Sequence, residues 1–88
     1  MKKLTEQEII ETVNGIFRDV FEIDAVRLTP EAKLFDDLGL DSLDAVDMMA
    51  NLQERFEVSL RNDERVRAVR TLADVYALVK TIQEEMNA

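Results

Sequence analysis

Hydrophobic residues recur at helical spacing close to the start of the chain. They follow one another every three or four positions, which places them along one face of a helix: Ile9, Val13, Ile16 and Val20. Thr5 and Glu8 precede this stripe in the S/T-x-x-E arrangement, in which each side chain accepts a hydrogen bond from the other residue's backbone N–H. The pattern therefore predicts a first helix over residues 5–21.

No sustained hydrophobic period is present in residues 22–41, which include the only proline, Pro30. A connection of about twenty residues is long for a small domain, because most connections in compact domains are several times shorter. We expect it to be held against the core by its apolar side chains: Ile23, Val26, Leu28, Leu34, Phe35 and Leu38. Loops of this kind often carry function.

The second half of the chain contains two long helical patterns and a short one. Residues 42–57 place apolar side chains at helical spacing, namely Ala45, Met49, Leu52 and Phe56, with Val46 beside them. Residues 59–70 predict a short third helix. Residues 71–86 predict a last long helix, in which Thr71 and Asp74 repeat the start signal of the first helix. No strand-like alternation appears. The sequence therefore predicts an all-α fold, a small four-helix bundle of three long helices and one short third helix with a long loop between helices one and two. We expect a single domain over residues 1–88.

The composition argues against several classes of function. The chain has no histidine and no cysteine, so it lacks the commonest general base, the thiol nucleophile and two common metal ligands. These features argue against an independent enzyme and against a metal centre. The net charge of −8 argues against nucleic-acid binding, which needs a basic surface.

The hydropathy pattern also bears on location. No apolar run approaches transmembrane length, and Glu6 and Glu8 follow the N-terminal lysines at once, unlike a signal peptide. We therefore expect a cytoplasmic protein without stable membrane insertion. We also expect a monomer, because building the bundle leaves no large apolar face.

One serine lies where the long loop becomes the second helix. Serine at that position most often caps the helix. Here, however, Asp41 can take the N-cap position and accept a hydrogen bond from the backbone N–H of Leu43 or Asp44. Ser42 would then be the first helical residue, with an unpaired hydroxyl lifted onto the surface by a turn at Gly39. A phosphate linked to that hydroxyl would lie near helix N–H groups and the positive end of the helix dipole.

Aspartates surround this serine. Five of them fall within twelve positions: Asp36, Asp37, Asp41, Asp44 and Asp47. Their spacing does not match the calcium-binding loop D-x-[DN]-x-[DN]-G-x5-E, and the serine is not in a G-x-S-x-G elbow. Weak nonspecific cation binding remains open as an alternative. The acidic charge disfavours a free anion and suits a covalently attached phosphate.

Residues 34–56, LFDDLGLDSLDAVDMMANLQERF, resemble the acyl carrier proteins, in which D-S-L follows an L-G turn and opens an acidic helix. The resemblance implies that Ser42 bears 4′-phosphopantetheine, transferred from coenzyme A by a phosphopantetheinyl transferase. The thiol of this arm would carry acyl groups as thioesters and present them to fatty acid or polyketide-type biosynthetic enzymes. The carrier itself would do no chemistry.

The resemblance also implies a recognition surface and a pocket. Acyl synthases, reductases and transferases with basic surfaces would contact helix two through Asp41, Leu43, Asp44, Asp47, Met48 and Glu54. A growing chain would be sheltered between helices by Val46, Ala50, Leu52, Leu60 and Val69. A solvated helix face and ordinary core packing explain the same residues, and the sequence does not separate these alternatives.

One segment departs from the family pattern. Residues 61–70, RNDERVRAVR, contain four arginines against two acidic residues. We interpret this as the sign of a specialised rather than a housekeeping carrier. The partner enzymes of such a carrier would recognise Arg65 and Arg67. A peptidyl or aminoacyl carrier is an alternative with the same mechanism. A small acidic helical adaptor with no prosthetic group is an alternative of another class.

Overall fold

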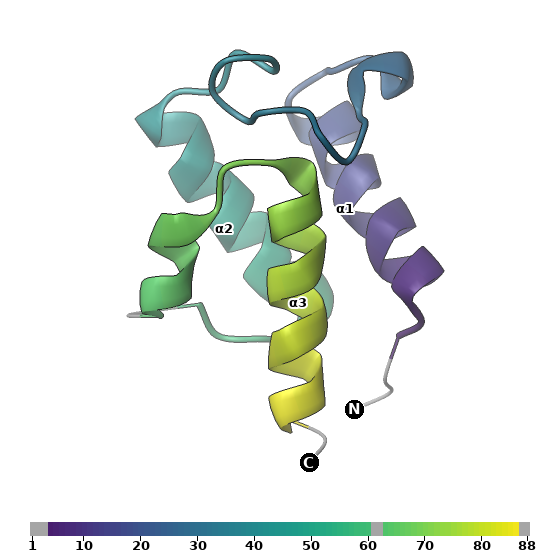
Figure 1. Ribbon diagram of the computed structural model, residues 1–88, viewed down its shortest axis with the longest axis vertical. Helices are drawn as coiled ribbons and strands as arrows, with labels where there is room; N and C mark the ends of the chain where they lie inside the picture. The colour runs from purple at the N-terminus through teal and green to yellow at the C-terminus, as the bar shows by residue number, and fades with distance from the viewer. Residues whose placement is uncertain (1–3, 61–62, 87–88) are drawn as a thin grey trace.

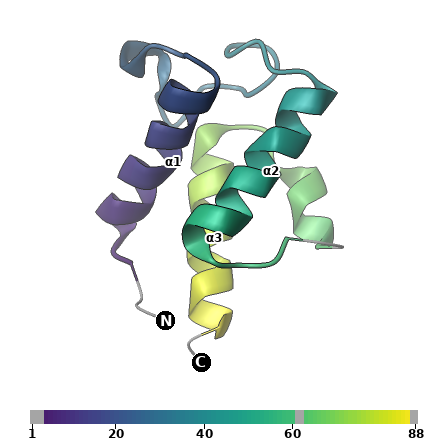
Figure 2. The ribbon, with the colours of Figure 1, turned by 180° about the vertical axis from the view of Figure 1, so that it is seen from behind.

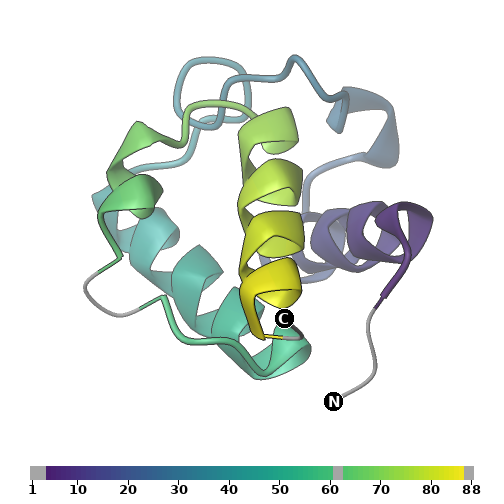
Figure 3. The ribbon, with the colours of Figure 1, turned by 60° about the horizontal axis from the view of Figure 1, so that its bottom comes forward.

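The computed structural model describes residues 4–60 and 63–86. These ranges contain three α-helices, α1 (Glu6–Val20), α2 (Ser42–Phe56) and α3 (Leu72–Met86), and two 3-10 helices, η1 (Ala25–Arg27) and η2 (Glu64–Ala68). The long loop between α1 and α2 crosses one end of the bundle, as Figure 1 and the reverse view in Figure 2 show. In Figure 3, α3 lies with α1 on one side and η2 on the other. The prediction of an all-α fold is confirmed.

Reciprocal caps begin the first and last α-helices. At α1, the Glu8 N–H donates to Thr5 Oγ1 at 3.1 Å, and the Thr5 N–H donates to Glu8 Oε1 at 2.9 Å. At α3, the Asp74 N–H donates to Thr71 Oγ1 at 3.2 Å, and the Thr71 N–H donates to Asp74 Oδ2 at 3.1 Å. These bonds satisfy N–H groups that have no partner inside a helix. Both predicted helix starts are confirmed.

The cap of α3 makes stability depend on pH. Asp74 also accepts the backbone N–H of Arg70 at 2.9 Å, and this bond, followed by those from Thr71, holds the pKa of Asp74 below its usual value. A carboxyl whose pKa is lowered by folding stabilises the fold above its unfolded-state pKa of about 3.9, and that stabilisation is lost as the pH falls through the folded-state value.

We therefore expect Asp74→Asn to lower the free energy of unfolding by about 1 kcal/mol near neutral pH, and by less at about pH 3. Urea denaturation at the two pH values measures the difference. Glu84→Gln, an exposed change on the same helix, is the control and should cost less than Asp74→Asn near neutral pH. An equal loss for Asp74→Asn at both pH values would contradict the ionised cap.

Buried side chains hold the long loop against the bundle. Four of the six residues expected to do so are buried: Ile23, Leu28, Leu34 and Leu38. The prediction was wrong for Val26 and Phe35, which are 83% and 46% exposed. Val26 lies in η1, a single turn in which no residue is buried, and Ala32 and Leu40 are buried elsewhere in the loop.

Backbone hydrogen bonds join the same loop to the start of α3. The Leu34 N–H donates to the Arg70 carbonyl at 2.9 Å, and the Leu72 N–H donates to the Ala32 carbonyl at 3.1 Å. Lys33 and Thr71 form an isolated antiparallel bridge between these bonds. The loop is therefore an ordered part of the fold that fixes the chain leading into α2.

In the described part of residues 59–70, the expected short third helix is a 3-10 segment, and residues 61 and 62 of that prediction lie outside the described residues. η2 covers only Glu64–Ala68 and begins after Asp63, whose carboxylate accepts the Arg65 N–H at 3.0 Å. Val66 and Val69 pack against the core, and their spacing of three matches the 3.0 residues per turn of a 3-10 helix. Within the described residues, the predicted bundle thus has its three long helices, and η2 takes the place of the fourth.

The end of α2 is strained. Glu57 follows the last residue of the helix with φ 53° and ψ 42°, a left-handed conformation that glycine adopts without the steric cost of a Cβ. We expect Glu57→Gly to raise the free energy of unfolding by up to about 1 kcal/mol. Glu54→Gly, an exposed change inside the same helix, should lower it by about 1 kcal/mol. Urea denaturation distinguishes the two, and a loss for both would contradict the strained cap.

Candidate functional site

A sharp turn precedes α2. Leu38 and Leu40 are buried, while Gly39 between them has a φ of 73°. That left-handed conformation lets the chain reverse between two anchored leucines and leaves Asp41 and Ser42 on the surface. The turn predicted at Gly39 is confirmed.

Asp41 fills the cap of α2 and leaves Ser42 unengaged. The Asp44 N–H donates to Asp41 Oδ1 at 2.9 Å, and the Asp41 N–H donates to Asp44 Oδ2 at 3.2 Å. Ser42 is the first residue of the helix and is exposed. Its hydroxyl forms no hydrogen bond with any residue that the structure describes. The alternative that Ser42 serves as the helix cap is thus wrong.

This arrangement fits a phosphate ester at Ser42 Oγ. The hydroxyl is accessible and has no partner within residues 4–60 and 63–86, and the backbone N–H groups of Ser42 and Leu43 lie in the first turn, where a helix supplies no internal acceptors. A phosphate there would also lie at the positive end of the helix dipole. Asp41 and Asp44 repel a free anion, so a covalent bond would be needed to keep a phosphate in place.

The exposed face of α2 is apolar at its start and acidic along its length. Leu43 and Val46 are 76% and 64% exposed. Asp47 and Glu54 are exposed, and Asp44, which takes part in the cap, is half-buried. Most of the residues expected to meet partner enzymes therefore lie on one accessible surface that begins at Ser42.

Met48 differs from this expectation. It is 5% exposed and lies in the core with Leu52 and Phe56, which follow at intervals of four residues. Met48 is therefore not available for surface contact in this structure. Val46, expected beside the apolar stripe, lies on the surface, because α2 turns its 48–52–56 face toward the core.

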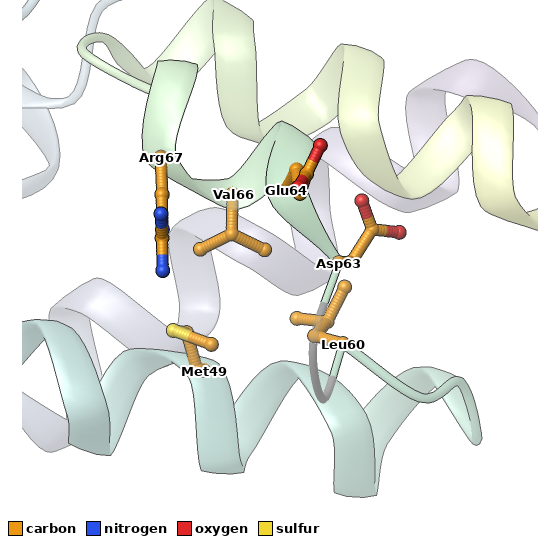
Figure 4. Close-up of a pocket in the computed structure, with 6 residues that line it drawn as sticks. All are labelled: Met49, Leu60, Asp63, Glu64, Val66 and Arg67. Carbon is orange, nitrogen blue, oxygen red and sulfur yellow. The ribbon is translucent and has the colours of Figure 1, made fainter.

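Two cavities lie beside α2 and share Met49. One, of about 510 Å³, is lined by Met49, Leu60, Asp63, Glu64, Val66 and Arg67. The other, of about 560 Å³, is lined by Val46, Met49, Ala50, Gln53 and Ser59. Figure 4 shows Val66 and Arg67 extending from η2 toward Met49 on α2, with Leu60 and Asp63 at the other end. We call the two cavities together the η2 groove.

The structure brings together three of the five residues expected to line an acyl pocket. Val46, Ala50 and Leu60 line the η2 groove. Leu52 is 1% exposed and belongs to the core, and Val69 lines a separate cavity of about 200 Å³ against α3. Gln53 and Ser59 also line the groove, but they were not predicted to do so. The sequence indicates only that both lie near the end of helix two.

The two arginines expected to meet partners have different surroundings. The Arg65 guanidinium donates to Asp63 Oδ2 at 2.7 Å and to Glu85 Oε2 at 2.9 Å, so it joins η2 to α3. These ion pairs raise the pKa of Arg65, and the hydrogen bond from Arg65 lowers the pKa of Asp63. Arg67 is exposed, and its guanidinium has no partner among the described residues. Arg67 is thus the accessible cation of this pair.

No group of three or more acidic, histidine or cysteine side chains in the described ranges is arranged to hold a metal ion. Within residues 4–60 and 63–86, no helix is long and apolar enough to cross a membrane.

Comparisons with known proteins bear on the same segment. A family model described as a phosphopantetheine attachment site matches residues 11–79. The chain is 44% identical over 79 residues to acyl carrier protein 2 of Ralstonia nicotianae, covering 90% of this chain and 96% of the relative. It is 36% identical over 77 residues to the acyl carrier protein of Clostridium acetobutylicum, covering 88% and 99%. It is 33% identical over 82 residues to the meromycolate extension acyl carrier protein of Mycobacterium tuberculosis, covering 93% and 70%.

The matched family has a 4′-phosphopantetheine prosthetic group and acts as a carrier, not as an enzyme. A chain without histidine or cysteine is consistent with that role, since the reactive thiol comes with the prosthetic group. The chain belongs to the acyl carrier protein family.

Proposed function

We propose that Ser42 Oγ is the attachment point of 4′-phosphopantetheine. The observation that carries this proposal is the exposed, unpaired Ser42 hydroxyl at the start of α2, left free because Asp41 fills the cap. In the transfer, this oxygen would form the new bond to phosphorus, the phosphoanhydride of coenzyme A would break and release adenosine 3′,5′-bisphosphate, and the hydroxyl proton would pass to a base on the transferase. The attached arm would supply the thiol on which an acyl group is carried as a thioester.

The partners we propose are a phosphopantetheinyl transferase and acyl synthases, reductases and transferases with basic surfaces. Leu43 and Val46 would give these enzymes an apolar contact close to Ser42. Asp47 and Glu54 would meet their arginines and lysines, which speeds association more than it tightens binding. Met48 is left out of this surface because it is buried.

We also propose that residues 1–88 act as one domain, as a monomer in the cytoplasm. The single core cluster that runs from Ile9 in α1 to Ile82 in α3 supports the single domain. The pathway we propose is a specialised fatty acid or polyketide-type one. The accessible Arg67 supports this, because it adds a cation to a surface that is otherwise mainly acidic.

Incubation with coenzyme A and a broad-range phosphopantetheinyl transferase, followed by intact-mass measurement, tests the attachment. A mass gain of one phosphopantetheine that maps to the peptide containing Ser42 is expected. A folded protein that gains no mass would favour the acidic adaptor instead.

A further inference from the structure

The η2 groove contains hydrogen-bond donors that have no acceptor among the described residues. Gln53 Oε1 accepts the Leu60 N–H at 2.8 Å. The oxygen of the side-chain amide is therefore directed toward the loop, and its N–H groups are available to another partner. The Ser59 hydroxyl and the Arg67 guanidinium form no hydrogen bond or ion pair with any described residue. The groove therefore presents donors from α2, from the following loop and from η2.

Two carboxylates line the groove, and one of them, Asp63, is engaged by an arginine. Both carboxylate oxygens of Asp63 accept from the Arg65 guanidinium, at 3.0 and 2.7 Å. Arg65 is in turn held by Glu85 of α3, which lines neither cavity of the groove. Glu64 is the remaining lining carboxylate, and it is exposed. The Arg65 ion pairs therefore engage the Asp63 carboxylate, and the donors of Gln53, Ser59 and Arg67 share the groove with the carboxylate of Glu64, which no described residue engages.

The apolar part of the groove lies between these donors. Met49 is shared by both cavities, and Leu60 and Val66 lie across from α2 (Figure 4). Met49 follows Ser42 by seven residues, which is about 10 Å along the helix axis. A plain hydrocarbon chain in the groove would contact Met49 and Val66 but would cover donors without replacing the hydrogen bonds they make to water.

We propose that the η2 groove holds acyl chains that carry acceptor oxygens, as a ketone or a carboxylate, beyond the thioester carbonyl. Arg67 is the specificity-determining residue, with Gln53 and Ser59 as neutral donors. The inference rests on the proposed attachment at Ser42. It adds the chemical class of the cargo, which neither the cap geometry nor the family specifies.

The test loads the full chain with octanoyl, 3-oxooctanoyl or carboxyl-ended octanoyl groups, using the matching acyl-coenzyme A and a broad-range transferase. Intact mass verifies each product, and thermal unfolding is then compared. We expect at least one oxygen-bearing form to unfold several degrees above the octanoyl form, since a bound group that contacts only the folded state stabilises it. A gain confined to the carboxyl-ended form would identify an anionic cargo, and a gain for the 3-oxo form a neutral one.

Arg67→Met should remove this difference, whereas Arg55→Met, an exposed arginine of α2 that lines neither cavity, should keep it. In ¹⁵N NMR spectra, the Arg67 Nε and Gln53 Nε2 signals should shift only with the oxygen-bearing chains. An octanoyl form that is equally or more stable would overturn the proposal, as would a difference that persists in Arg67→Met. A chain that gains no mass would contradict the attachment at Ser42 itself, so the two failures are distinguishable.

Discussion

Ser42→Ala is expected to abolish the gain of mass that the wild-type chain shows with coenzyme A and a phosphopantetheinyl transferase. Alanine has no hydroxyl oxygen to bond to phosphorus. The fold should survive, because Asp41 and not Ser42 accepts the Asp44 N–H at the start of α2. Intact mass measures the loss, and circular dichroism measures the helical content.

The control for this experiment is Thr29→Ala, which removes an exposed hydroxyl from the long loop and should leave the mass gain unchanged. A full mass gain in Ser42→Ala would mean that another residue is modified and would contradict the proposed attachment. Loss of the helical signal together with the mass gain would contradict the cap assignment, since Asp41 would then be insufficient to start α2.

Leu52→Ala is expected to lower the free energy of unfolding by about 2–5 kcal/mol. Leu52 is 1% exposed and lies in the core rather than in the η2 groove. Its truncation removes buried apolar contacts and leaves a cavity that the surrounding core side chains can fill only partly. Such a loss is a large part of the total stability of a small domain, about 5–15 kcal/mol. Urea denaturation measures it.

Two variants calibrate this result. Leu52→Met nearly conserves volume and should cost less than about 1.5 kcal/mol. Val46→Ala truncates an exposed side chain of the same helix and should change stability by about 0.5 kcal/mol or less. If Leu52→Ala cost no more than Val46→Ala, Leu52 would belong to the wall of a pocket, and its placement in the core would be wrong.

Local features of this protein could be predicted from its sequence. The starts of the long helices follow from the pairs Thr5–Glu8, Asp41–Asp44 and Thr71–Asp74, in which each residue bonds a partner three positions away. The position of Ser42 at the start of α2 depends on the same short-range bonds. Because these hydrogen bonds join residues only three positions apart, the helix starts could be predicted from residue type and spacing without the rest of the chain.

The rotation of α2 could not be predicted in this way. Apolar residues occupy positions 45, 46, 48 and 49. An apolar stripe that ends at Leu52 and Phe56 can therefore start from Ala45 and Met49 or from Met48, and each choice turns a different face of the helix toward the core. Packing in the bundle decides that Met48 is buried and Val46 is exposed. Which residues line a groove and which fill the core depends on this rotation, and therefore on contacts between helices.

The arginines show the same division between sequence and tertiary structure. The sequence by itself determined the all-α class, the helix starts and the serine at a capped turn. It also determined that residues 61–70 carry a net positive charge. Arg65 and Arg67 are equivalent by composition, but Glu85, twenty positions along the chain, binds Arg65 and leaves Arg67 accessible. Asp63 binds Arg65 from two positions away, but only the tertiary structure decided the Glu85 contact, because α3 folds back beside η2 and brings that carboxylate within reach of the Arg65 guanidinium.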